Sequence, residues 1–87
     1  MEYIARENIL TLNIHGMTKE EARVFLEIEL ETILPEIMEI EIVHGYSKGE
    51  ILLQFVRKEF KHKKIKEIKI GQNPGVTYYI LKSDMKS

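Results

Sequence analysis

The chain has 87 residues, a formal net charge of −1 and no cysteine. A chain of this length forms one domain, residues 1–87, with a two-layer core and little room for a deep enclosed pocket. The lack of cysteine excludes disulfides, thiolate zinc sites and cysteine nucleophiles. The first residues show no signal-peptide pattern, and no apolar run reaches membrane-spanning length. We therefore expect a soluble cytoplasmic protein without a membrane partner.

The first strand and the first helix are predicted from residues 9–34. Apolar residues alternate at Leu10, Leu12 and Ile14, which is typical of a strand. Thr18 and Glu21 then have the spacing of a helical capping box. The helix is expected to end before Pro35, because the residue preceding a proline disfavours helical geometry. Its core face comprises Ala22, Phe25, Leu26, Leu30 and Ile33.

The rest of the chain predicts four further elements. Residues 37–43 and 65–70 have strand patterns, and the β-branched and tyrosine-rich run 76–81 is a final strand after a turn at residues 72–75. A second helix is expected over residues 49–62. Its core contacts are Leu52, Phe55, Val56 and Phe60. The element order is βαβαββ, with its core at about residues 9–82 and short terminal tails. This order predicts an α/β two-layer sandwich, a four-stranded mixed sheet with both helices on one face.

Two His-Gly pairs, His15-Gly16 and His44-Gly45, each follow a predicted strand and precede a predicted helix. A strand, a crossover helix and the next strand usually form a parallel pair, so both pairs should lie at the same carboxyl edge of the sheet. Ligands of open α/β sheets bind at such edges, and helix N-termini favour anions. If the third strand is parallel to the first, the turn at residues 73–75 joins this edge. The sequence therefore predicts a phosphate-sized site there.

The same residues carry a resemblance to a known family. The motifs are "LNIHG" at residues 12–16, "HGYSKG" at residues 44–49 and "GVTYYILK" at residues 75–82, and the helix start at residues 18–22 reads T-x-x-E-A. Together, in this order and spacing, they resemble the small MutS-related (Smr) domain. The resemblance implies an α/β sandwich, binding of DNA or RNA and, in several members of the family, endonucleolytic cleavage.

Three positions depart from the family pattern. Asn13 stands where the family has an acidic residue, Ser47 replaces a glycine, and Leu53 falls where an arginine is expected. The loss of the carboxylate at Asn13 argues against full nuclease activity, so binding is the firmer expectation. The alternatives are a catalytically silent nucleic-acid or ribosome-associated binding module, or a protein-interaction domain.

His15 and His44 are the candidate catalytic residues, because an imidazole titrates near neutral pH. One ring would activate water or a ribose hydroxyl while the other stabilises the phosphate or protonates the leaving oxygen, and a required 2′-hydroxyl would favour RNA. Asn13 is a candidate for orienting the His15 ring. The alternative is that both histidines are strand-end residues that bond to neighbouring loops. Without a nearby carboxylate ligand, no metal site and no cofactor are expected.

The candidate phosphate contacts lie in the turns that follow the strands. Gly16, Gly45 and Gly49 permit positive φ angles and close approach of a phosphate to the backbone. Lys48 would offer a point charge, or would simply be solvated. The complete predicted set is Gly16, Gly45, Ser47, Lys48, Gly49, Asn73 and Gly75.

Two surface features suggest further contacts. Residues 1–41 contain ten acidic and three basic side chains, whereas residues 42–87 contain four and ten, which suggests an anionic partner for the second half or simply two solvated surfaces. Its basic run is mostly expected away from the histidines, as a secondary electrostatic contact or a solvated surface, and consists of Arg57, Lys58, Lys61, His62, Lys63, Lys64, Lys66 and Lys69. Val24 and Ile28 form a small apolar stripe on the first helix, which predicts a weak homodimer. Tyr78 and Tyr79 should face opposite sides of the last strand.

Overall fold

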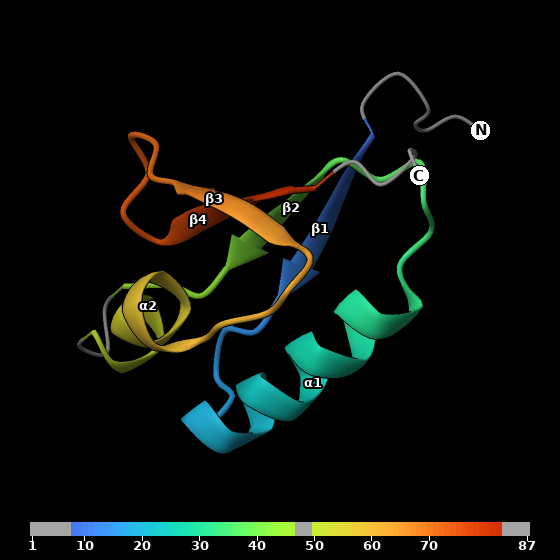
Figure 1. The fold of residues 1–87 in the computed structure, drawn as a ribbon. Coiled ribbons are helices and arrows are strands. Elements are labelled where there is room, and N and C mark those ends of the chain that lie inside the picture. Colours follow the sequence, from blue (N-terminus) through green and yellow to red (C-terminus); the bar gives the residue numbers. More distant parts are fainter. Residues whose placement is uncertain (1–7, 47–49, 83–87) are drawn as a thin grey trace.

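The computed structural model describes residues 8–46 and 50–82 (Figure 1). Its elements are β1 (Ile9–Asn13), α1 (Lys19–Thr32), β2 (Glu39–Val43), α2 (Ile51–Gln54), the π-helical turn η1 (Phe55–Glu59), β3 (Ile65–Lys69) and β4 (Val76–Leu81). The four strands form one mixed sheet, which confirms the predicted α/β fold. In the part of the chain that is described, no helix is long and apolar enough to cross a lipid bilayer.

The strand order is β1-β2-β4-β3. β1 pairs with β2 in parallel, whereas β4 is antiparallel to both β2 and β3. β3 therefore runs in the same direction as β1 and β2, a direction that the sequence pattern had left open. The carboxyl ends of these three strands, and the turn that leads into β4, consequently lie at one edge of the sheet.

Both helical segments cover the same face of the sheet (Figure 1). The core between the layers joins inward-facing strand residues to buried residues of α1 and of the second helical segment. Tyr79 is fully buried in this core, while Tyr78 lies on the opposite face of the sheet, as predicted from their alternation. The buried cluster consists of Leu12, Ile14, Ala22, Leu26, Leu30, Ile40, Ile42, Phe55, Val56, Phe60, Tyr79 and Leu81.

Helix α1 begins and packs as its sequence pattern predicted. Thr18 Oγ1 accepts a hydrogen bond from the Glu21 backbone at 3.1 Å, and Glu21 Oε1 accepts one from the Thr18 backbone at 3.0 Å. The helix ends at Thr32, where Ile33 adopts extended geometry. Val24 and Ile28 are exposed on its outer surface, so the apolar stripe is present. The homodimer inferred from that stripe stays a prediction.

The second helix is shorter than the expected span of residues 49–62, and this prediction was wrong at its C-terminal end. The α-helical part covers only Ile51–Gln54, and the π-helical turn ends at Glu59. There the Phe60 amide donates to the Phe55 carbonyl at 2.8 Å, while the Val56 carbonyl accepts the buried Tyr79 hydroxyl at 2.8 Å. The Phe60 ring stacks on Tyr79, with centroids 6.1 Å apart. Packing against β4 therefore overrides the helical pattern after Glu59.

Two strands are also shorter than the alternation of apolar residues predicted. β2 begins at Glu39 instead of residue 37, because the Ile37 amide closes a turn onto the Leu34 carbonyl at 3.1 Å. β3 ends at Lys69, and Ile70 is exposed in the following turn. A register irregularity between Ile65 and Glu67 interrupts the pairing of β3 with β4.

Candidate functional site

Three segments meet at the carboxyl edge of the sheet, around Gly45. The amides of His44 and Gly45 both donate to the Gly75 carbonyl, at 2.9 and 3.0 Å. The backbones are so close that a Cβ on Gly75 would lie 3.3 Å from the Cα of Gly45. The turn before β4 is itself closed by Asn73, whose Oδ1 accepts the Gly75 amide at 2.9 Å. The structure thus places Asn73 and Gly75 beside the second His-Gly pair.

His15 completes this group of residues from the end of β1. Because Asn13 pairs with Val43, His15 comes level with Gly45 in the neighbouring segment. Its ring lies against the Gly45 backbone, and a Cβ added to Gly45 would overlap Cδ2 of the imidazole. Gly45 also has a φ of +81°, so its backbone conformation favours glycine independently of the contact. Gly16 has a φ of +90° but open space around it.

Asn13 does not orient the His15 ring as the sequence suggested. Its Oδ1 accepts a hydrogen bond from the His15 backbone amide at 2.9 Å. Asparagine side chains commonly close such local turns onto the backbone two residues later. Asn13 therefore fixes the course of the chain at the end of β1, and the imidazole of His15 remains exposed to solvent.

His44 has a different environment, because it is buried and has only 3% of its surface exposed. Its Nδ1 lies 2.8 Å from the Gly45 carbonyl, which can only accept, so Nδ1 carries the hydrogen. Its Nε2 lies 2.8 Å from Thr77 Oγ1, and the same hydroxyl accepts a hydrogen bond from Arg57 Nε at 2.8 Å. In the neutral ring with Nδ1 protonated, Nε2 is an acceptor, so the Thr77 hydroxyl donates its own hydrogen to Nε2. Both ring nitrogens of His44 are used within the fold.

Burial lowers the pKa of His44 below its ordinary value of 6.5, and the positive charge of Arg57 lowers it further. The hydrogen bond to the Gly45 carbonyl opposes this effect without reversing it. Above about pH 6.5, His44 is therefore neutral in the fold, with Nδ1 protonated. A general acid or base would have to exchange protons at a nitrogen that is reachable from solvent, and His44 offers none.

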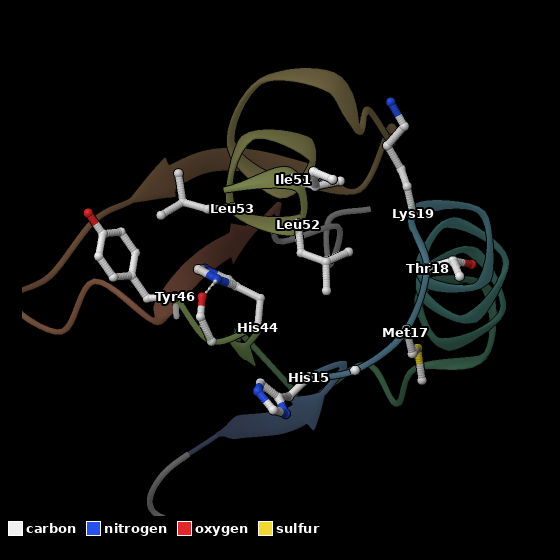
Figure 2. A pocket seen from close by; sticks show the side chains of 11 residues that line it. His15, Met17, Thr18, Lys19, His44, Tyr46, Ile51, Leu52 and Leu53 are labelled. Carbon is white, nitrogen blue, oxygen red and sulfur yellow. Dashed lines mark hydrogen bonds between the residues drawn. The ribbon is translucent and has the colours of Figure 1, made fainter. Parts of the chain in front are cut away.

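A cleft of about 560 Å³ opens beside these residues, between the start of α1 and α2 (Figure 2). Most of its walls are apolar, and Tyr46 and Ile51 are strongly exposed at its rim. None of the described residues that line it is acidic. The lining consists of His15, Gly16, Met17, Thr18, Lys19, His44, Gly45, Tyr46, Ile51, Leu52 and Leu53.

The described helix starts are poorly suited to hold an anion. At α1, the capping box uses the Thr18 and Glu21 amides, and Glu20 and Glu21 place negative charge in the first turn. The α-helical part of the second helix is only four residues long, and it follows the exposed residue Glu50. Lys19, at the rim of the cleft, forms an ion pair with Glu59 at 3.0 Å. Any phosphate contact at this edge therefore has to come from glycine backbone and individual side chains.

The basic run of the second half divides between two places. Arg57 was predicted to be solvated or a secondary contact, and this was wrong, because it is half-buried and bonds to Thr77. Lys64 donates to the Leu30 carbonyl at 2.6 Å, near the C-terminal end of α1 and away from the histidines. Lys63, Lys64 and Lys82 line a second groove there, of about 440 Å³. This placement agrees with the expectation that most of the lysines lie away from the site.

Ser47, Lys48 and Gly49, which the sequence assigned to phosphate binding, lie outside the described residues. No group of three or more metal-ligating side chains occurs within residues 8–46 and 50–82. Comparison of the chain with protein-family models, with curated proteins and with solved structures found no match. The roles of the site residues therefore depend on the geometry described above and on the motif resemblance.

Two residues of the site, Thr77 and Arg57, were not identified as site residues from the sequence. A signal for Thr77 was present, because it shares the inward face of β4 with Tyr79 and Leu81. A threonine in that phase is buried, and its hydroxyl then needs a partner. No comparable signal identifies Arg57, since its contact with β4 depends on how the second helix packs.

Proposed function

We propose that this chain is a nucleic-acid-binding domain of the Smr type that holds its ligand at the carboxyl edge of the sheet. The observation that carries the proposal is the meeting of His15, Gly45 and Gly75 at that edge. The exposed imidazole of His15 lies against the Gly45 backbone there, and the neighbouring Gly16 has open space beside it in which a phosphodiester can approach the backbone. These residues belong to the three motifs on which the resemblance depends.

The same geometry argues against cleavage by a pair of histidines. That mechanism needs two imidazoles that exchange protons with the substrate, and His44 uses both nitrogens for Thr77 and Gly45. Asn13 supplies no carboxylate in place of His44. We therefore propose a binding domain in which His44 holds the loop and His15 contacts the ligand.

Fluorescence anisotropy with labelled RNA and DNA, at about 50 and 200 mM salt, tests the binding proposal. The expected result is binding that weakens as salt rises, because phosphate contacts release counterions. At each salt concentration, His15→Ala should bind the nucleic acid more weakly than the wild type does. The variant should remain folded, since the ring is exposed. Lys82→Ala is a matched control, because Lys82 lies at the second groove. An absence of binding to every nucleic acid at low salt would refute the proposal.

A weak RNA-cleaving activity is the second candidate, and the exposed imidazole of His15 favours it. Such an activity would use His15 alone, to take the proton of a ribose 2′-hydroxyl. Incubation of end-labelled RNA with the protein, with and without magnesium, decides between a binding domain and a nuclease. We expect the RNA to stay intact under both conditions. Cleavage that His15→Ala abolishes would instead establish the nuclease.

A further inference from the structure

We infer that the apolar cleft beside His15 receives an unpaired base of a single-stranded nucleic acid, a proposal that rests on the nucleic-acid-binding function above. The cleft has a volume of about 560 Å³, which lies within the range of sites that enclose small ligands. It runs from the His15–Gly45 contact to α2, so a chain held at the glycine backbone has the cleft directly beside it.

The walls of the cleft match a flat, uncharged group. Leu52 and Met17 are half-buried in it, and Ile51 is 67% exposed at its rim. Figure 2 shows the Tyr46 ring to the left of His44 and the His15 ring below it. Exposed rings next to aliphatic walls are suited to stacking with a nucleobase, whatever its sequence.

The described lining residues carry no carboxylate that would repel the phosphates of a nucleic-acid chain. The ammonium group of Lys19, at the rim, is paired with Glu59. A base inside the cleft would therefore meet mainly apolar walls, and its phosphate would lie near the exposed imidazole and the glycines. A base that is stacked and paired in a duplex cannot enter such a cleft, so the ligand must be single-stranded or locally opened.

Anisotropy measurements with three matched oligonucleotides separate base contacts from phosphate contacts. The probes are a labelled single strand, the same strand with abasic spacers at successive positions, and its duplex, each prepared as RNA and as DNA. We expect the abasic strand to bind between about five- and 150-fold more weakly than the intact strand, which is the range for loss of one base–aromatic stack. The duplex should bind no better than the abasic strand.

Variants at Tyr46 test whether the difference in affinity between the intact and abasic strands arises in the cleft. Tyr46 is 51% exposed, so its replacement should leave the fold intact. Tyr46→Ala should reduce the difference between the intact and abasic strands by at least about fivefold, because one stacking surface is lost. Tyr46→Phe should preserve the difference, since the ring remains. Leu34→Ala, at an exposed aliphatic residue near the C-terminal end of α1, is the control and should change nothing.

A second probe reports the base directly. A 2-aminopurine placed in the single strand should change its fluorescence on binding to the wild type, and less so with Tyr46→Ala. Equal binding of intact strand, abasic strand and duplex would overturn the base cleft while the nucleic-acid-binding function stands. An absence of binding to any of the three would refute both proposals together.

Discussion

Thr77 Oγ1 lies 2.8 Å from Nε2 of His44, and this hydrogen bond holds the buried imidazole in one tautomer. The hydroxyl donates to the ring because the hydrogen of the neutral imidazole is on Nδ1, which leaves Nε2 as an acceptor; the same hydroxyl accepts from Arg57 Nε. The ring in turn donates to the Gly45 carbonyl. Each group therefore donates a hydrogen bond to the next, from Arg57 through Thr77 and His44 to the Gly45 carbonyl. The Gly45 backbone in turn contacts both Gly75 and the His15 ring.

Replacement of Thr77 tests this chain of hydrogen bonds. Thr77→Val keeps the shape but removes the hydroxyl, so His44 Nε2 and Arg57 Nε each lose a partner in a buried site. We expect the free energy of unfolding to fall by about 2–3 kcal/mol, the cost of leaving buried polar groups unsatisfied. Thr77→Ser keeps the hydroxyl and loses only a buried methyl group, which should cost about 1 kcal/mol. Urea unfolding of both variants measures the difference, and equal losses would contradict the proposed bonding.

The buried state of His44 predicts an acid-sensitive step in stability. Its pKa is about 6.5 in the unfolded chain and is lowered in the folded protein. At a pH between the unfolded and the folded pKa, the unfolded chain therefore binds more protons than the folded one. The contribution to stability is complete above about pH 6.5 and is lost as the pH falls through the lowered pKa. Urea unfolding at pH 8, 7, 6 and 5 should show this decline. NMR of the imidazole nitrogens should show a neutral ring with Nδ1 protonated at pH 7 and a protonation midpoint below pH 6.5, and a midpoint at or above pH 6.5 would contradict the prediction.

A second acid-sensitive contact has a different pH window. The pKa of Glu31 is lowered from 4.5, chiefly by its hydrogen bond to His62 at 2.8 Å. A lowered carboxylate pKa gives stability that is present above about pH 4.5 and is lost below it. Glu31→Gln should therefore flatten the stability profile below about pH 4.5 and leave the decline that begins near pH 6.5 unchanged.

The contact between His15 and Gly45 can be separated from backbone strain by comparing two glycines. Gly16 and Gly45 both have positive φ, so alanine at either position should cost about 1–2 kcal/mol. Only at Gly45 would the new methyl group overlap the His15 ring. Gly45→Ala should therefore be more destabilising than Gly16→Ala, by about 1–3 kcal/mol. Adding His15→Ala should remove this excess. An equal cost of Gly45→Ala with and without His15 would show that the ring does not pack there.

The two His-Gly pairs look equivalent in the sequence, yet the structure makes one exposed and the other buried. The strand alternation contains the reason. Ile40 and Ile42 face the core, so His44 follows in the inward phase, whereas Ile14 is inward and His15 follows it in the outward phase. Extending the alternation two residues past each strand would have predicted the buried histidine. The convergence of the two His-Gly pairs at one edge was predictable because the βαβ order makes β1 and β2 parallel, whereas the direction of β3, which brings Gly75 to this edge, was not.

Other features of the site depend on contacts that no local pattern contains. Arg57 lies in a basic run, and its neighbours Lys58 and Lys61 are exposed, so composition favoured a solvated surface. The early end of the second helix likewise depends on a hydroxyl 23 residues later in the chain. Both were missed because tertiary hydrogen bonds to β4 decide them, and sequence periodicity reports only local structure.

The hydroxyl of Tyr79 is expected to define where the second helix ends. It donates to the Val56 carbonyl at 2.8 Å inside the core. Tyr79→Phe keeps the ring and its stacking on Phe60 but leaves this carbonyl without that donor, which should cost about 1–3 kcal/mol. Tyr78→Phe is the matched control, because the Tyr78 hydroxyl bonds at 3.4 Å to Glu41 on the outer face of the sheet. Its loss should change the free energy of unfolding by no more than about 0.5 kcal/mol.

Tyr79 also predicts an alkaline limit to stability. Burial raises its pKa far above the ordinary value of 10, so above pH 10 the unfolded chain releases this proton while the folded chain keeps it. The contribution is therefore complete below about pH 10 and is lost progressively as the pH rises beyond it. Tyr79→Phe cannot titrate at this position, so its stability should fall less steeply between pH 9 and 11 than that of the wild type. Parallel slopes for the two proteins in urea unfolding would show that the Tyr79 hydroxyl ionises as freely in the fold as in the unfolded chain.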